Sequence, residues 1–153
     1  MDKVVTKLFG EIGIDGQKLI QFPEGIIGFE QLKRFLLIHD TEKADSRIIW
    51  LQSIDEPAFA LPVIDPLFIK EDYNPVIEDE LLNKIGEIKE DELFVLVILK
   101  VPSDITQMTV NLKAPVVINP NTRMGCQILA ENEEYMIRYP IYDILKGLRK
   151  EGE

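Results

Sequence analysis

The sequence "ELFVLVILKV", residues 92–101, is the most apolar stretch of the chain and the one that best indicates its fold. From Leu93 to Leu99 it contains only Leu, Phe, Val and Ile, with no polar residue at alternate positions. A run of this length and composition predicts a β-strand that is buried on both faces. It is far too short to cross a bilayer, which takes about 20 residues.

Shorter apolar runs, most of them separated by turn signals, lie on both sides of this strand. Asp15-Gly16 is a strong hairpin signal, so the two runs that flank it are expected to pair antiparallel. Pro62 predicts that its run lies at a sheet edge or a bulge. Pro120 suits the second position of a turn in "NPNTR". The expected strand regions are Val4–Ile14, Gln17–Phe22, Arg34–Asp40, Arg47–Asp55, Phe59–Ile64, Met108–Ile118, Met124–Ala130 and Tyr135–Tyr139.

Two stretches instead have a helical pattern. In "EDELLNKIG", residues 78–86, Leu81, Leu82 and Ile85 share one helical face, acidic residues occupy the first turn and Gly86 provides a stop. In "PIYDILKGLRK", residues 140–150, apolar residues recur at i, i+3, i+4 and i+7, with Pro140 at the start and basic residues at the end. These apolar residues are Ile141, Ile144, Leu145 and Leu148.

Many short strands with only two helical segments predict an all-β fold, mainly β with short helices. Strands that alternate with helices would indicate a parallel α/β sheet, and this chain lacks that alternation. A sheet of about eight strands must protect its edges, most simply by closing. We therefore expect a single barrel-like antiparallel β domain with a C-terminal helix, spanning residues 1–153.

The composition narrows the classes of function. The chain has 17 basic and 27 acidic residues, a formal net charge of −10. Such a chain should repel a phosphate backbone, so direct nucleic-acid binding is not expected. It should attract basic proteins, although acidity also serves solubility alone. The charged residues in "MDKVVTKLFGE" argue against a signal peptide, and no run is long enough for a membrane span, so we expect a cytoplasmic protein.

Residues that could carry catalysis are few. His39 is the only histidine, which excludes a histidine-rich metal site, and no nucleophile motif accompanies it. Cys126 is the only cysteine, which excludes an internal disulfide, and it is expected to be a small buried hydrophobe. Carboxylates cluster at turns and helix starts, where caps and solvated faces are expected. The prediction is a protein without catalytic residues, metal or cofactor, whose function resides in a surface that binds another protein.

Two irregular apolar stretches are the candidates for that surface. "FPEGIIGFE", residues 22–30, holds four apolar residues together with a Pro-Glu-Gly turn and a second glycine. "IDEPAFALPVIDP", residues 54–66, has a similar mixture of apolar residues, carboxylates and prolines. Apolar side chains in such backbone either plug a barrel from one end or are displayed to a partner, and exposed apolar clusters are uncommon on monomers.

These stretches also carry a resemblance to a known family. "FPEGIIGFEQLKRFLLI", "WLQSIDEPAFALPVIDP" and "LKAPVVINPNTRMGCQ", in this order in an acidic chain, resemble the FliW family of flagellar assembly factors. The resemblance extends from about Ile14 to Leu145. It implies a barrel-like β domain and a regulator with two protein partners. One is flagellin and the other is CsrA, a small dimeric RNA-binding protein that represses translation; FliW freed from exported flagellin captures CsrA, and flagellin mRNA is translated again.

The expected partner-binding residues come from the two irregular stretches. Apolar anchors at the centre of an interface with carboxylates at its rim would suit a basic partner. These residues are Glu24, Ile26, Phe29 and Glu30 in the first stretch and Asp55, Glu56 and Phe59 in the second. The alternative for Phe29 and Phe59 is a place in the core. Alternative functions are a flagellin chaperone without a regulatory role and a barrel that encloses a small ligand or a carboxylate-based hydrolytic site.

Overall fold

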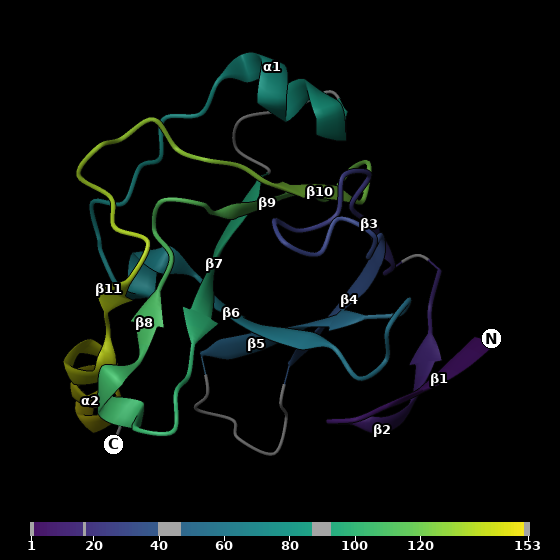
Figure 1. Ribbon diagram of the computed structural model, residues 1–153, viewed down its shortest axis with the longest axis horizontal. Coiled ribbons are helices and arrows are strands. Elements are labelled where there is room, and N and C mark those ends of the chain that lie inside the picture. Colours follow the sequence, from purple (N-terminus) through teal and green to yellow (C-terminus); the bar gives the residue numbers. More distant parts are fainter. Residues whose placement is uncertain (1, 17, 40–46, 87–92, 152–153) are drawn as a thin grey trace.

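The computed structural model describes residues 2–16, 18–39, 47–86 and 93–151, and this part of the chain is mainly β (Figure 1). The strands are β1 (Asp2–Thr6), β2 (Gly10–Ile14), β3 (Ile20–Gln21), β4 (Arg34–His39), β5 (Ile48–Ser53), β6 (Ala60–Ile64), β7 (Phe94–Lys100), β8 (Thr109–Val110), β9 (Val116–Asn119), β10 (Met124–Gln127) and β11 (Tyr139–Pro140). The helical segments are η1 (Pro66–Phe68), α1 (Asp79–Leu82), η2 (Asn83–Ile85), η4 (Ile105–Gln107) and α2 (Tyr142–Glu151).

Seven strands close into a barrel, which confirms the predicted architecture. The order is β7-β6-β5-β4-β3-β10-β9, and β9 returns to pair with β7. Every neighbouring pair is antiparallel except β3 and β10, which run parallel and meet at the pair Gln21 and Met124. Closure satisfies the backbone groups that an open sheet would leave at its edges.

The strand β7 is the central element, and it is buried on both faces as its sequence predicts. Leu96 belongs to the barrel core with Ile98 packed against it, whereas Val97 and Leu99 belong to a second core outside the barrel. Adjacent residues are thus both buried, at 6% exposure for Leu96 and 0% for Val97. An unbroken apolar run is what such a position requires, because side chains alternate between the two cores.

Strands β8 and β9 form one interrupted partner strand of β7. Leu99 pairs with Val110 in β8 and Leu96 with Val116 in β9, so that five residues, 111–115, face only two, 97 and 98. The extra residues form a bulge. The Asn111 side chain stabilises it, because its Oδ1 accepts hydrogen bonds from the backbone N–H groups of Lys113 and Ala114. The bulge separates β9, which is part of the barrel, from β8, which pairs with β11.

The first hairpin differs from the prediction. β1 and β2 pair with each other in a separate two-stranded sheet, with the reversal at residues 7–9 and not at Asp15-Gly16. Thr6 stabilises this reversal, because its Oγ1 donates to the Gly10 carbonyl and accepts from the Phe9 N–H. Asp15 does begin a turn, shown by the 2.9 Å bond from Lys18 N–H to its carbonyl, but that turn leads from β2 into β3 of the barrel.

The predictions for Pro62, for the segment Tyr135–Tyr139 and for Pro140 were also only partly correct. Pro62 does not lie at a sheet edge, because β6 is between β5 and β7 in the barrel. Only Val63 and Ile64 pair with β7, so the missing N–H of Pro62 leaves no hydrogen bond to β7 unmade. Tyr135–Tyr139 is not a strand, since only Tyr139 enters β11 and the Met136 carbonyl instead accepts from Leu112. Pro140 belongs to β11, and α2 begins two residues later.

The helical segments cover two outer faces of the barrel. α1 and η2 lie over β9 and β10, where Ile85 packs with Val117 and Cys126, and Gly86 ends η2 as its sequence predicts (Figure 1). α2 lies beside β8 and β11, with Ile144 and Leu145 packed against the second core (Figure 1). The side chains of Leu81, Leu148, Arg149 and Lys150, which the predicted helical patterns included, lie outside the described residues.

Candidate partner-binding surface

The loop between β3 and β4 begins with a tight turn that only glycine can complete. The N–H of Gly25 donates to the carbonyl of Phe22 at 2.9 Å, which closes the Pro-Glu pair between them. Gly25 has φ +69°, and a Cβ on it would lie 2.6 Å from the backbone of Glu30. The left-handed conformation and the close approach of two backbone segments both require a residue without a side chain.

A second reversal follows directly and separates buried from exposed apolar residues. Ile26 and Phe29 exchange backbone hydrogen bonds of 3.4 and 2.7 Å across Ile27 and Gly28. Ile26 is 2% exposed and belongs to the barrel core, whereas Ile27 is 54% exposed. The Ile27 N–H donates to Oε1 of Gln127 on β10 at 2.9 Å, so the exposed turn is fixed to the barrel wall.

The loop between β5 and β6 is organised by a buried glutamine. Gln52 is fully buried, and its Nε2 lies 2.9–3.1 Å from the carbonyls of Ser53, Pro57 and Phe59. The hydroxyl of Ser53 accepts the N–H of Glu56 at 2.9 Å. A loop whose carbonyls converge on one side-chain amide has a defined shape, because each bond limits the alternatives open to its backbone.

Asp55 joins the two loops. Its Oδ2 accepts from the backbone N–H groups of Lys33 and Arg34 at 2.8 and 3.0 Å, and its Oδ1 lies 2.8 Å from Nε of Arg34. Burial raises the pKa of the Asp55 carboxyl, but the hydrogen bonds from Lys33 and Arg34 and the Arg34 charge outweigh it, so the pKa is lowered overall. The carboxylate therefore stays ionised and connects the loops at neutral pH.

The second connection is aromatic. The rings of Phe29 and Phe59 lie 4.4 Å apart between centroids and are inclined by 48°. Phe59 packs against the barrel core, whereas Phe29 is 37% exposed. Of the two alternatives left open by the sequence, a place against the core holds for Phe59, whereas Phe29 covers it at the surface and its contact with a partner stays a prediction.

The carboxylates near this aromatic pair fall into two groups. Glu24 lies 3.0 Å from Nζ of Lys84, and Asp55 is bonded as above, so both are paired within the chain. Glu30 and Glu56 are exposed, and neither forms an ion pair with a residue that the structure describes. Oε1 of Glu30 accepts the N–H of Gly28 at 3.3 Å, but neither carboxylate is neutralised by a cation among the described residues, so both can meet one from outside.

We call residues 23–30 and 54–59 the two-loop surface. All seven residues singled out from the sequence lie within it, but not in one role. Ile26 is buried and Asp55 is bonded to the neighbouring loop, so both shape the surface from within rather than display a side chain. The sequence reasoning did not select Ile27, Gln52 or Gln127. The exposure of Ile27 follows from its place in a two-residue reversal, and the long-range bonds of the glutamines leave no local sequence signal.

The residues weighed for catalysis have ordinary surroundings. Burial, followed by the nearby Glu24 charge, raises the pKa of the Cys126 thiol to about 11, so it is an unreactive thiol. His39 is exposed at the end of β4. No group of three metal-ligating side chains is found among the described residues. Within the same residues, none of the helices combines the length and the apolar character that crossing a membrane requires.

Comparison with known proteins agrees with this architecture. The model of the FliW protein family matches residues 3–141. The flagellar assembly factor FliW of Lachnospira eligens is 54% identical over 146 residues, covering 94% of this chain and 97% of the relative. That of Lachnoclostridium phytofermentans is 46% identical over 151 residues, covering 98% and 97%.

A solved structure shows the same fold. The crystal structure of a flagellar assembly factor FliW superposes with a TM-score of 0.84 at 30% identity, covering 92% of this chain and 97% of the other. The family match, the relatives and the shared barrel agree with one another over almost the whole chain. This protein therefore belongs to the FliW family of flagellar assembly factors.

Proposed function

We propose that this FliW-family protein is a non-catalytic regulator that acts in the cytoplasm through two protein partners. As a single domain over residues 1–153, it captures the RNA-binding repressor CsrA and so permits translation of flagellin mRNA. Cytoplasmic flagellin sequesters it until export removes the flagellin. The observation that supports a binding role best is the two-loop surface, where exposed apolar side chains are held in a defined shape beside unpaired carboxylates.

The shape of the surface suits an interface. Ile27 and Phe29 provide apolar area at its centre, at 54% and 37% exposure. Glu30 and Glu56 provide charge at the rim. Interface cores are enriched in aromatic side chains and are surrounded by a polar rim that excludes water from the centre. Because the loops are already fixed by Asp55, Gln52 and Gln127, docking costs little ordering entropy.

Charge supports the assignment of a basic RNA-binding partner. The net charge of −10 attracts a protein with basic surface, which an RNA-binding repressor needs. Carboxylates docked beside the RNA groove would also lower its affinity for phosphate, without direct overlap with the RNA.

The alternative of a small-ligand barrel has little support, because the barrel core is filled. Its interior side chains are Ile20, Phe22, Ile26, Leu32, Phe35, Leu51, Val63, Leu96, Val116 and Ile118. A filled apolar interior leaves no polar cavity for a ligand or for hydrolytic carboxylates. The chaperone alternative shares the flagellin partner and differs in having no effect on the repressor.

The test is a titration of the protein into a complex of CsrA with labelled RNA, followed by RNA release, with and without stoichiometric unassembled flagellin. We expect release that flagellin abolishes. No release, together with tight flagellin binding, would favour the chaperone. Failure to bind either partner would refute the proposal.

Variants locate the interface. Phe29→Ala should weaken binding of at least one partner by about tenfold or more, as expected for a central apolar contact. Phe68→Ala is the matched control, because Phe68 is also a surface phenylalanine, at 41% exposure, and lies outside the two-loop surface.

A second set of variants tests the charge. The double variant Glu30→Gln with Glu56→Gln should slow CsrA association at low salt. The control Glu71→Gln with Glu80→Gln removes the same charge elsewhere and should slow association less.

A further inference from the structure

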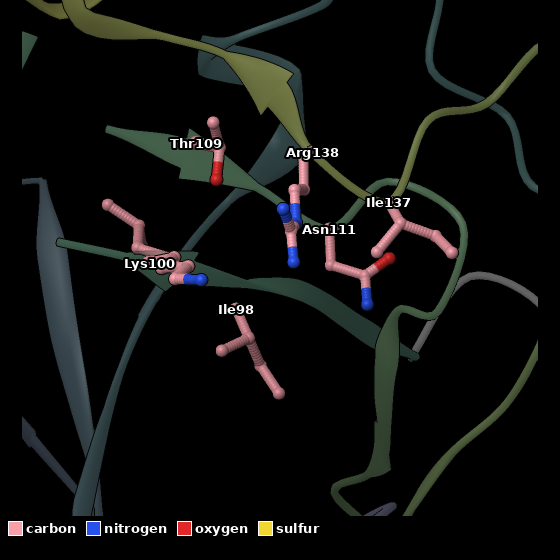
Figure 2. Close-up of a pocket in the computed structure, with 7 residues that line it drawn as sticks. Ile98, Lys100, Thr109, Asn111, Ile137 and Arg138 are labelled. Atoms are coloured by element: carbon pink, nitrogen blue, oxygen red, sulfur yellow. The ribbon is translucent and has the colours of Figure 1, made fainter. Parts of the chain in front are cut away.

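A hollow in the molecular surface lies beside β8, apart from the two-loop surface. It has a volume of about 230 Å³ and opens on the face that β7, β8 and the segment before β11 share (Figure 2). Its lining comes from three segments that are distant in sequence. We call it the β8 pocket, and its lining residues are Ile98, Leu99, Lys100, Thr109, Asn111, Ile137 and Arg138.

Strand register explains why Lys100 and Thr109 meet. Lys100 pairs with Thr109, and Thr109 pairs with Pro140 of β11. In the next row, Leu99, Val110 and Tyr139 pair across the same strands and pack in the second core. Since side chains alternate along a strand, the first row projects from the opposite face. That face is the one on which the pocket opens.

The charged groups of the pocket are hydrogen-bond donors, and the hydroxyl of Thr109 can donate or accept. Figure 2 shows the ends of Lys100 and Arg138 directed toward the space between them, whereas the amide end of Asn111 points away from Lys100. Neither Lys100 nor Arg138 has an ion pair or a side-chain hydrogen bond with any residue that the structure describes. The oxygen of Asn111 is occupied by the backbone of the bulge, so its Nδ2 amide faces outward as a donor.

The absence of a lining carboxylate makes this arrangement unusual in so acidic a chain. The sequence has 27 acidic and 17 basic residues, yet Lys100 of β7 and Arg138 of the segment before β11 line one pocket with no Asp or Glu among its lining residues. Two cations that line one pocket repel each other, and an anion between them would offset that repulsion. The two cationic side chains therefore give this pocket a positive potential in a negative molecule.

We propose that the β8 pocket binds the carboxylate of an acidic side chain from a peptide segment of a protein partner. Its volume lies below the usual 300–1,000 Å³ of small-molecule sites and suits one side chain. Apolar residues at its edge favour a peptide over a bare ion: Ile137 lines the pocket at 62% exposure, and its sequence neighbour Met136 is 50% exposed. The acidic residue of the peptide is therefore flanked by apolar residues.

This inference does not depend on the proposed function, and it concerns a surface of opposite character. The two-loop surface offers free carboxylates to a basic partner, whereas the β8 pocket offers cations to an acidic one. A protein with both can hold two partners of opposite local charge at separate places.

The test is a titration of isotope-labelled full-length protein, followed by amide chemical shifts in NMR. The probes are the capped peptide acetyl-Leu-Glu-Leu-amide, its Gln counterpart and inorganic phosphate. We expect the Glu peptide to shift amides around Lys100, Thr109 and Arg138 in a saturable way, with a Kd in the millimolar range, as fits a single buried carboxylate contact. The Gln peptide should bind at least about tenfold more weakly, because it lacks the charge.

A double variant tests the cations. Lys100→Gln with Arg138→Gln should weaken binding of the Glu peptide by about tenfold or more. Lys7→Gln with Lys18→Gln removes the same total charge from exposed positions outside the β8 pocket and should leave binding within about twofold. An equal loss in both variants would show a general charge effect and overturn the proposal. So would equal affinity for both peptides, shifts by phosphate without shifts by the Glu peptide, or no shifts at all; thermal melting verifies that each variant is folded.

Discussion

The carboxylate of Asp55 should stabilise the fold far more than its place at the surface suggests. It accepts from two backbone N–H groups, of Lys33 and Arg34, and meets Nε of Arg34 at 2.8 Å. Replacing Asp55 by alanine removes all three bonds and disconnects the β3–β4 loop from the β5–β6 loop. Replacement by asparagine keeps the shape and one acceptor oxygen but removes the charge.

The magnitude follows from the kind of bond that is lost. A hydrogen bond to a charged group contributes about 1.5–3 kcal/mol net. The Asp55 side chain is 25% exposed and that of Arg34 is 50%, so water replaces part of each bond, and the ion pair itself adds at most about 1 kcal/mol. We expect Asp55→Ala to lower the free energy of unfolding by about 3 kcal/mol and Asp55→Asn by about half of that.

The effect should depend on pH with a defined sign. The pKa of Asp55 is lowered in the folded protein, so its stabilisation is fully present above the unfolded pKa, near 3.9. It is lost as the pH falls below about 4 and through the lower folded pKa. The difference between the wild type and Asp55→Asn should therefore be large at pH 7 and shrink at pH 3.

Urea unfolding followed by circular dichroism at both pH values measures these differences. Asp72→Asn is the control, because Asp72 also pairs with a cation, Lys70 at 3.0 Å, but is exposed and accepts from no other residue's backbone N–H. Its change should be smaller. A loss below about 0.5 kcal/mol for Asp55→Ala, or a difference that persists unchanged at pH 3, would refute the assignment of Asp55 as the connection between the loops.

Three further outcomes test the same surface and its surroundings. Gly25→Ala should cost about 2–4 kcal/mol of unfolding free energy, from the left-handed backbone and the contact 2.6 Å away, whereas Gly16→Ala, with open space around its Cβ, should change little. Phe29→Ala, at the surface, should cost about 2 kcal/mol, against about 3–5 kcal/mol for the fully buried Phe22→Ala; equal losses would place Phe29 in the core. Cys126, with its pKa near 11, should react with a thiol reagent at pH 8 at least about 100-fold more slowly in the native protein than in urea, and similar rates would contradict its burial.

The strands that could be predicted are those with dense local information. The run before Lys100 has no polar position, so only a strand between two cores accommodates it. Pro120 in the second turn position leads to the β9–β10 hairpin as expected, with Arg123 N–H bonded to the Asn119 carbonyl at 2.8 Å. In both, the deciding sequence signal is contained in a few consecutive residues.

The errors arise where long-range pairing decides. Asp15-Gly16 makes a turn, but the next strand, β3, pairs with β4 and with the distant β10 and not with β2, so no hairpin results. Tyr135–Tyr139 has the composition of a strand, yet a partner segment of β8 is only two residues long. The candidate surface shows the same division. Its two stretches could be identified from their composition, whereas the roles of Ile26 and Asp55 depend on bonds and burial that only the folded chain supplies.

The parallel pair of β3 and β10 has a consequence for the order of events in folding. Gln21 and Met124, which form this seam, are about 100 residues apart in sequence, while the other pairs from β3 to β7 join consecutive strands. Contacts between distant residues form late, because the entropy cost of closing a long loop comes before the contacts stabilise the chain. On a ribosome, β3 to β7 would emerge as an open sheet with an uncovered apolar face until β9 and β10 follow. The nascent chain therefore passes through a stage at which it is prone to aggregation, and this stage ends only when its last third has been synthesised.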